Sequence, residues 1–91
     1  MIKKTMIMES ECGLHMRPAM RLVELSQTFS SDIKIVKGDM EANAESILEI
    51  TILAVANGEE IEIIVEGNDE EEAMKALEEL IENNFEMKVK Q

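Results

Sequence analysis

The segment "IKIVKGDMEANAES", residues 33–46, predicts a β-hairpin followed by the start of a helix. Ile33–Val36 is rich in β-branched residues, as strands are, and a glycine-containing tight turn follows it. Met40–Ala44 is expected to return as a second, shorter strand. Ser46 stands three residues before Glu49, which is the spacing of a capping box, so a helix is expected to begin there.

Strand and helix patterns alternate on both sides of this hairpin. Residues 1–8 have the weak alternation of a strand, and Pro18 suits the first turn of a helix. After the hairpin, Asn57-Gly58 is expected to stop the second helix, and Glu60–Val65 alternates as a strand does. Gly67–Asp69 is expected to cap a last helix. The predicted order is therefore β-α-β-β-α-β-α.

Each expected element has one apolar face, which must be buried against another layer. A single sheet with helices packed on one side buries all of these faces, and the inserted hairpin favours a split βαβ topology. We therefore predict an α+β fold. The length of 91 residues predicts one domain, residues 1–91, in which residues 87–91 form a flexible tail.

Composition excludes several classes of partner. The formal net charge of −11 argues against nucleic acids and anionic membranes, because both select basic surfaces. Phe29 and Phe85 are the only aromatic residues, so no base-stacking platform is expected. No apolar run is long enough to cross a membrane, and no signal peptide is apparent. With a single cysteine, the chain is expected to be cytoplasmic.

The chain's only histidine lies in the segment "CGLHMRPAM", residues 12–20, at the expected start of the first helix. The free N–H groups and the dipole of a helix N-terminus attract anions and disfavour a protonated imidazole. His15 is therefore expected to be neutral and nucleophilic, and able to accept a phosphoryl group. Arg17 can add a cationic contact to that group, and Gly13 allows close approach of the backbone.

Other chemistries fit this segment less well. A metal site needs more ligands than one histidine and scattered carboxylates, so neither a metal nor another cofactor is expected. A Cys12–His15 protease pair is not expected, because the domain is too small for a substrate cleft and an oxyanion hole. Taken singly, each residue has an ordinary explanation: a surface histidine, a solvated arginine, a small buried cysteine. The combination indicates a site.

The string Gly13-Leu14-His15-x-Arg17-Pro18-Ala19 resembles the active-site signature of HPr, the histidine-containing phosphocarrier family of the bacterial phosphoenolpyruvate-dependent sugar phosphotransferase system. A second family landmark matches at residues 44–48, and the resemblance covers nearly the whole chain. It implies an HPr-like open-faced β-sandwich, in which a four-stranded antiparallel sheet is covered on one face by helices.

The resemblance also implies a function. His15 would accept a phosphoryl group on Nδ1 from phosphorylated enzyme I and pass it to a histidine of an enzyme IIA domain, with Arg17 assisting the transfer. Such a protein is a carrier with a covalent phosphohistidine intermediate and not an enzyme. A monomer suits a shuttle of this kind, because one face serves donor and acceptor in turn.

Ser46 matches the serine that an HPr kinase/phosphorylase modifies in many bacteria, so that kinase is a further expected partner and Ser46 a second expected phosphorylation site. An ordinary helix cap explains Ser46 equally well. The expected docking surface consists of Met16, Met20, Ile47 and Leu48, which place apolar side chains next to both sites.

Five positions depart from the family pattern. Cys12 replaces a residue that is often polar, and carboxylates stand at Glu45 and Glu49, where relatives often carry lysine or glycine. Glu24 and Gln27 occupy places where some relatives carry lysines. Partners are therefore expected to have less acidic docking faces.

Two other functions stay open on these grounds. One is a regulatory or nitrogen-branch HPr paralogue that controls a partner protein by its phosphorylation state. The other is a small binding module in which His15 is incidental, although that leaves the adjacent Arg17 and Pro18 without a reason.

Overall fold

The structure is a computed structural model that describes residues 1–8, 16–56 and 58–82, with the backbone alone for residues 16–18. The element order is the predicted β-α-β-β-α-β-α. The strands and helices along the chain are β1 (Ile2–Ile7), α1 (Met16–Ser26), β2 (Asp32–Lys37), β3 (Met40–Asn43), α2 (Ile47–Leu53), β4 (Glu60–Glu66) and α3 (Glu70–Glu82). The expected tail at residues 87–91 lies outside the described residues.

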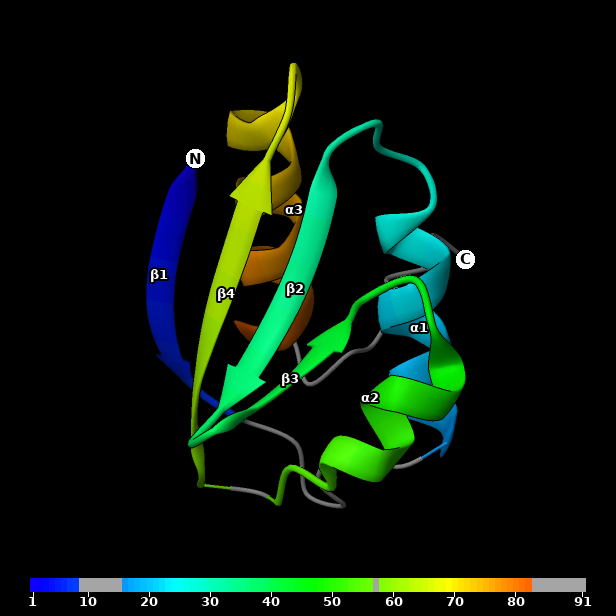
Figure 1. Cartoon of the computed structure of the whole chain (residues 1–91). Helices are drawn as coiled ribbons and strands as arrows, with labels where there is room; N and C mark the ends of the chain where they lie inside the picture. The colour runs from blue at the N-terminus through cyan, green and yellow to red at the C-terminus, as the bar shows by residue number, and fades with distance from the viewer. Residues whose placement is uncertain (9–15, 57, 83–91) are drawn as a thin grey trace.

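The four strands form one antiparallel sheet in the order β1-β4-β2-β3. β4 lies between β1 and β2, so the last strand of the chain is inserted beside the first. In Figure 1 the sheet faces the viewer, α3 runs behind it, and α1 and α2 lie side by side at the right. The helices thus cover one face, and the predicted open-faced α+β sandwich is confirmed.

The core lies between the sheet and the helices. Alternation places Ile61, Ile63 and Val65 of β4 on the covered face, where each is buried. The helices contribute buried residues at helical spacing: Ala19 and Leu22 from α1, Ile50 and Leu53 from α2, and Ala73, Leu77 and Ile81 from α3. Burial of these apolar side chains holds α1 and α2 side by side on the covered face of the sheet.

The helix α2 ends earlier than Asn57-Gly58, where the sequence pattern placed its stop. Ala54 is the C-cap, with φ 53° and ψ 51° in the left-handed region. Leu53 and Val55 are both buried, although a continued helix would point them to different sides, and the left-handed residue between them brings both to the core. Lys37 Nζ donates to the carbonyls of Leu53 (3.3 Å) and Ala54 (2.9 Å), which satisfies the end of the helix without glycine.

We expect the substitution Ala54→Gly to raise the free energy of unfolding. A left-handed conformation costs an L-residue about 1 kcal/mol, which glycine avoids, and the exposed Ala54 side chain contributes no core packing. Urea unfolding measures the change. Ala56→Gly is the matched control, because Ala56 is also exposed and has no positive φ, so the same substitution there is expected to destabilise.

A carboxylate joins the start of α3 to the loop before β2. Asp69 Oδ2 accepts a hydrogen bond from the Ser30 N–H (2.9 Å), and Oδ1 accepts from the Ser31 N–H (3.0 Å) and hydroxyl (2.5 Å). The Ser31 hydroxyl and the Ser30 amide hold the pKa of Asp69 below its usual value. At Gly67, a Cβ would lie 2.5 Å from Ser31 Oγ, so the close approach requires glycine.

These bonds make stability depend on pH. Because the pKa of Asp69 is lower in the folded chain, its contribution is complete above the unfolded pKa of about 3.9 and is lost as pH falls through the folded value. We expect Asp69→Asn to lower the urea midpoint clearly at about pH 7 and by a smaller amount at about pH 3, which lies below the unfolded pKa. Asp39→Asn, in the exposed β2–β3 turn, should leave both midpoints unchanged; a pH-independent loss for Asp69→Asn would contradict the account.

Candidate functional site

The segment that carries the predicted phosphoryl site adjoins the start of α1. His15 and Cys12 lie outside the described residues, and α1 begins at Met16, the next residue in the chain. The backbone of Arg17 and Pro18 lies in the first turn of α1, where the sequence pattern placed the proline. The roles of His15 and Arg17 therefore stay predictions. The start of α1 beside them lies where the sequence pattern placed it.

Ser46, the second predicted site, is the N-cap of α2. Its backbone is extended (φ −111°, ψ 109°), and its Oγ accepts a hydrogen bond from the Glu49 N–H at 3.3 Å, as predicted. The reciprocal half of the capping box is different. Glu49 Oε1 accepts from the Asn43 N–H (2.8 Å) at the end of β3, while the Ser46 N–H donates to the Asn43 carbonyl (3.0 Å). The Glu49 carboxylate therefore ties α2 to the hairpin.

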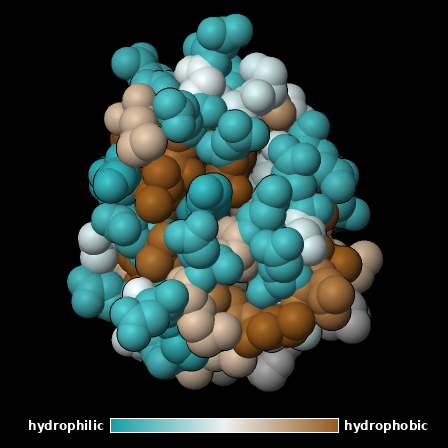
Figure 2. Space-filling model, viewed as in Figure 1, coloured by the Kyte–Doolittle hydropathy of each residue, from teal (hydrophilic) through white to brown (hydrophobic). Residues whose placement is uncertain are grey.

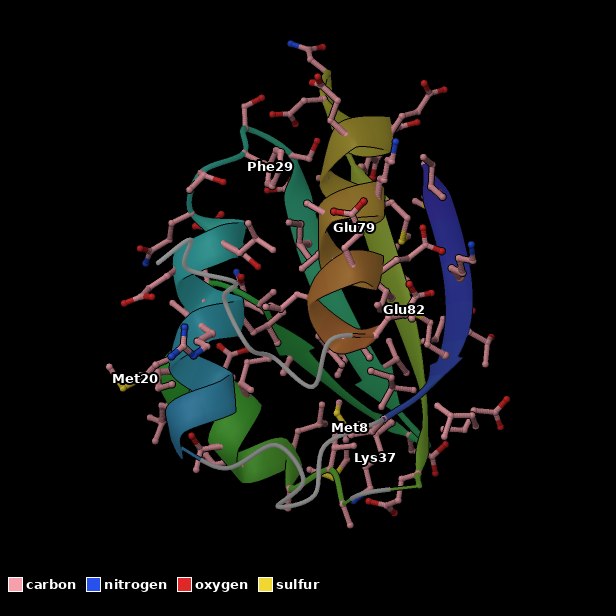
Figure 3. The ribbon with its side chains drawn as sticks, turned by 180° about the vertical axis from the view of Figure 1, so that it is seen from behind. Met8, Met20, Phe29, Lys37, Glu79 and Glu82 are labelled. Carbon is pink, nitrogen blue, oxygen red and sulfur yellow. The ribbon has the colours of Figure 1, made fainter. Side chains whose placement is uncertain are left out.

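An apolar surface extends over α1 and α2. Met20 is 47% exposed, Leu48 68% and Ile52 60%, and we call these three residues the α1–α2 patch. Figure 2 shows the hydrophobic surface over α2, and in Figure 3 Met20 projects outward from α1. Elsewhere in the described surface, the other large exposed apolar side chains (Met1, Ile7 and Met40) lie on the strands or their ends.

The predicted docking surface differs from this patch in its membership. Met20 and Leu48 are exposed as expected, but Ile47 is half-buried and packs against the core. The side chain of Met16 lies outside the described ones. Ile52 was missed, although its position four residues after Leu48 places the two on one helical face, and that spacing was the available signal.

Charged side chains surround the patch. Glu24, Glu45 and Glu49 are exposed, whereas Arg21 is half-buried. Lys37, the last residue of β2, extends its side chain to the end of α2, and its Nζ lies 3.1 Å from Glu59 Oε1 (Figure 3). The Ala56 N–H, which donates to Glu59 at 2.6 Å, and then Lys37 lower the pKa of Glu59. The Lys37 ammonium group is therefore already bound to Glu59 and to the carbonyls at the end of α2.

The described residues offer no cluster of three histidine, cysteine, aspartate or glutamate side chains that could hold a metal ion. Within the same residues, every helix is too short or too polar to cross a membrane.

A family model for the HPr component phosphorylation site of the phosphotransferase system matches residues 2–83. This chain belongs to the HPr family. Among its relatives, the phosphocarrier protein HPr of Treponema pallidum is 38% identical over 86 residues, which are 94% of this chain and 98% of that protein. The HPr-like protein Crh of Halalkalibacterium halodurans is 42% identical over 77 residues, 85% of this chain and 92% of that protein.

Solved structures agree with the sequence matches. The crystal structure of HPr-C-His from Thermoanaerobacter tengcongensis is 40% identical, with a TM-score of 0.91 over 98% of this chain and 100% of that one. The HPr-family chain is therefore a phosphocarrier protein of the phosphotransferase system, and not a catalyst in its own right. Family membership implies partners within that system, enzyme I and enzyme IIA proteins.

Proposed function

We propose that this HPr-family protein takes a phosphoryl group from phosphorylated enzyme I onto His15 and gives it to an enzyme IIA protein. The observation that carries the proposal is the string Gly-Leu-His-Met-Arg-Pro-Ala at residues 13–19, inside the match to the family's phosphorylation-site model. The described start of α1 at Met16 supports it, because the free N–H groups of a first helical turn favour an anion beside them.

The transfer is a pair of substitutions at phosphorus. A lone pair on the neutral His15 imidazole attacks the phosphorus atom, and the new P–N bond forms as the bond from phosphorus to the donor breaks. In the second step the acceptor's histidine attacks, and the P–N bond to His15 breaks. Arg17 offsets the charge of the phosphoryl oxygens in both steps. No metal or cofactor takes part in this scheme.

We propose that partners dock on the α1–α2 patch together with Met16 and Ile47. Exposed apolar side chains at 47–68% cost little to desolvate, and a small patch of this kind suits a contact that forms and separates repeatedly. The same two helices hold the start of α1 and the Ser46 cap, so docking there brings a partner to both predicted sites.

We propose Ser46 as a regulatory phosphorylation site. Its place at the start of α2 favours a phosphate, whereas the nearby carboxylates of Glu45 and Glu49 oppose one. With ATP and an HPr kinase/phosphorylase, the protein should gain an acid-stable phosphate that Ser46→Ala prevents. An unchanged mass would contradict the regulatory role and show that Ser46 acts only as the N-cap of α2.

We propose further that residues 1–91 act as one domain and as a monomer in the cytoplasm. The support for a monomer is that β1 pairs with β4 of its own chain along all six of its residues. Light scattering coupled to size exclusion should give the mass of one chain. A stable dimer would contradict this part of the proposal.

The alternative function is that of a regulatory paralogue, and the 42% identity to an HPr-like protein named separately from HPr favours it. The two functions separate at the second transfer. Incubation with phosphoenolpyruvate and cognate enzyme I should give an acid-labile gain of one phosphate. Subsequent loss of that phosphate to an enzyme IIA protein supports the relay, whereas a phosphate that no enzyme IIA protein accepts supports regulation. No gain at all supports an incidental histidine.

A further inference from the structure

We propose that the partner surface that docks on the α1–α2 patch is cationic, with lysine or arginine side chains around an apolar centre. This inference rests on the proposed function and specifies the chemistry of its partners. The proposal follows from the arrangement of charge around Met20, Leu48 and Ile52 in this chain.

Each apolar member of the patch has an exposed carboxylate three or four residues away in the chain. Glu24 follows Met20 by four residues on α1. Glu45 precedes Leu48 by three residues but lies before the Ser46 N-cap, outside α2, whereas Glu49 precedes Ile52 by three residues within α2. Because residues three or four apart are neighbours on a helical surface, Glu24 and Glu49 border the patch on α1 and α2. Glu45 adds a third exposed carboxylate in the turn just before α2.

Cations do not balance these carboxylates. Among the described side chains of α1 and α2, Arg21 is the only cationic one, and it is half-buried. Lys37, the last residue of β2, donates to the carbonyls of Leu53 and Ala54 and pairs with Glu59. Arg17 belongs, in the proposed function, to the phosphoryl group. The patch therefore presents excess negative charge.

A phosphorylated donor adds further negative charge at this face. A phosphoryl group carries a charge of about −1.5 to −2 near neutral pH, so it and the border carboxylates repel each other. A docking surface with lysine or arginine offsets both charges and guides the approach over distances of about 10 Å at moderate salt. An acidic docking surface would instead bring like charges together on every encounter.

The test is the rate of phosphoryl transfer from phosphorylated cognate enzyme I to this protein, measured as kcat/KM from about 50 mM to about 500 mM salt. We expect kcat/KM to fall by about tenfold or more as salt rises, as it does for attraction between opposite charges. Glu24→Lys and Glu45→Lys should each lower kcat/KM at low salt by about fivefold and flatten its salt dependence.

Glu72→Lys is the matched control, because Glu72 is exposed and lies in the first turn of α3, at the other end of the molecule from α2 (Figure 1). It changes the net charge equally and should leave kcat/KM within about twofold. Thermal melting checks that all variants are folded.

Transfer that speeds up with salt, or with the lysine variants, would overturn the cationic partner and leave the relay standing. Equal losses of kcat/KM for all three lysine variants would show that only the net charge of the protein matters. That result would also overturn the cationic docking surface. Absence of transfer at every salt concentration would contradict the relay itself, and the docking proposal with it.

Discussion

His15→Ala is expected to abolish the acid-labile phosphorylation of this protein by phosphoenolpyruvate and enzyme I. The imidazole is the only nucleophile in the proposed scheme whose phosphorylated form is labile enough to pass the group on, and alanine removes it entirely. Intact-mass spectrometry under neutral conditions measures the phosphate. The loss should be complete, because the chain contains no other histidine that could substitute.

Two controls make this result specific. Ser46→Ala should leave the acid-labile gain intact, because Ser46 caps α2 and takes no part in the transfer. Cys12→Ser should also retain it, which separates His15 from the neighbouring thiol. The variants need equal stability, checked by thermal melting. A labile phosphate that persists in His15→Ala would contradict the assignment.

Met20→Gln is expected to lower kcat/KM for phosphoryl transfer from enzyme I by about tenfold, mainly through KM. Glutamine has nearly the shape of methionine and no charge, so the substitution removes apolar contact without altering the electrostatics. Combination with Leu48→Gln should deepen the loss, because both side chains belong to the α1–α2 patch. Steady-state kinetics with enzyme I as the varied component separates KM from kcat.

Met40→Gln is the matched control for this prediction. Met40 is 48% exposed and Met20 is 47% exposed, but Met40 begins β3, outside the two helices that form the patch. The same chemical change at the same exposure should therefore leave kcat/KM within about twofold. Equal effects of the two substitutions would show that docking does not centre on the α1–α2 patch.

Patterns within short segments predicted most of the architecture. β-Branched residues marked β2 and alternation marked β4, while Pro18, Ser46 and Gly67–Asp69 marked the starts of the three helices. Each of these signals depends on near neighbours in the chain. The motif around His15 was likewise local, and it located the family without knowledge of the fold.

What the sequence pattern missed depends on contacts between distant segments. The end of α2 at Ala54 depends on Lys37, which lies 17 residues earlier in the chain. Its Nζ donates a hydrogen bond to the Ala54 carbonyl, so the helix ends there without a glycine. The Glu49 carboxylate accepts its hydrogen bond from the Asn43 N–H on β3, and not from the N–H of the Ser46 N-cap. Asp69 bonds to Ser30 and Ser31 across 38 or 39 residues, and no local rule pairs them.

The docking surface illustrates the same division. Leu48 and Met20 were expected to be exposed, but which neighbours join them depends on how α2 rotates against the sheet. Ile50 and Leu53 turn inward, so Ile47 is half-buried and Ile52 faces outward. Helical spacing gives the faces of α2, and the packing of α2 decides which face remains open.

The most direct test of the account is to locate the phosphate. The wild-type protein is phosphorylated with phosphoenolpyruvate and enzyme I and digested with a protease at neutral or alkaline pH. The masses of the fragments are then measured by mass spectrometry. The account predicts one phosphate, lost in acid, on the fragment that contains His15 and not on the fragment that contains Ser46. An acid-stable phosphate, or one on any fragment without His15, would contradict it.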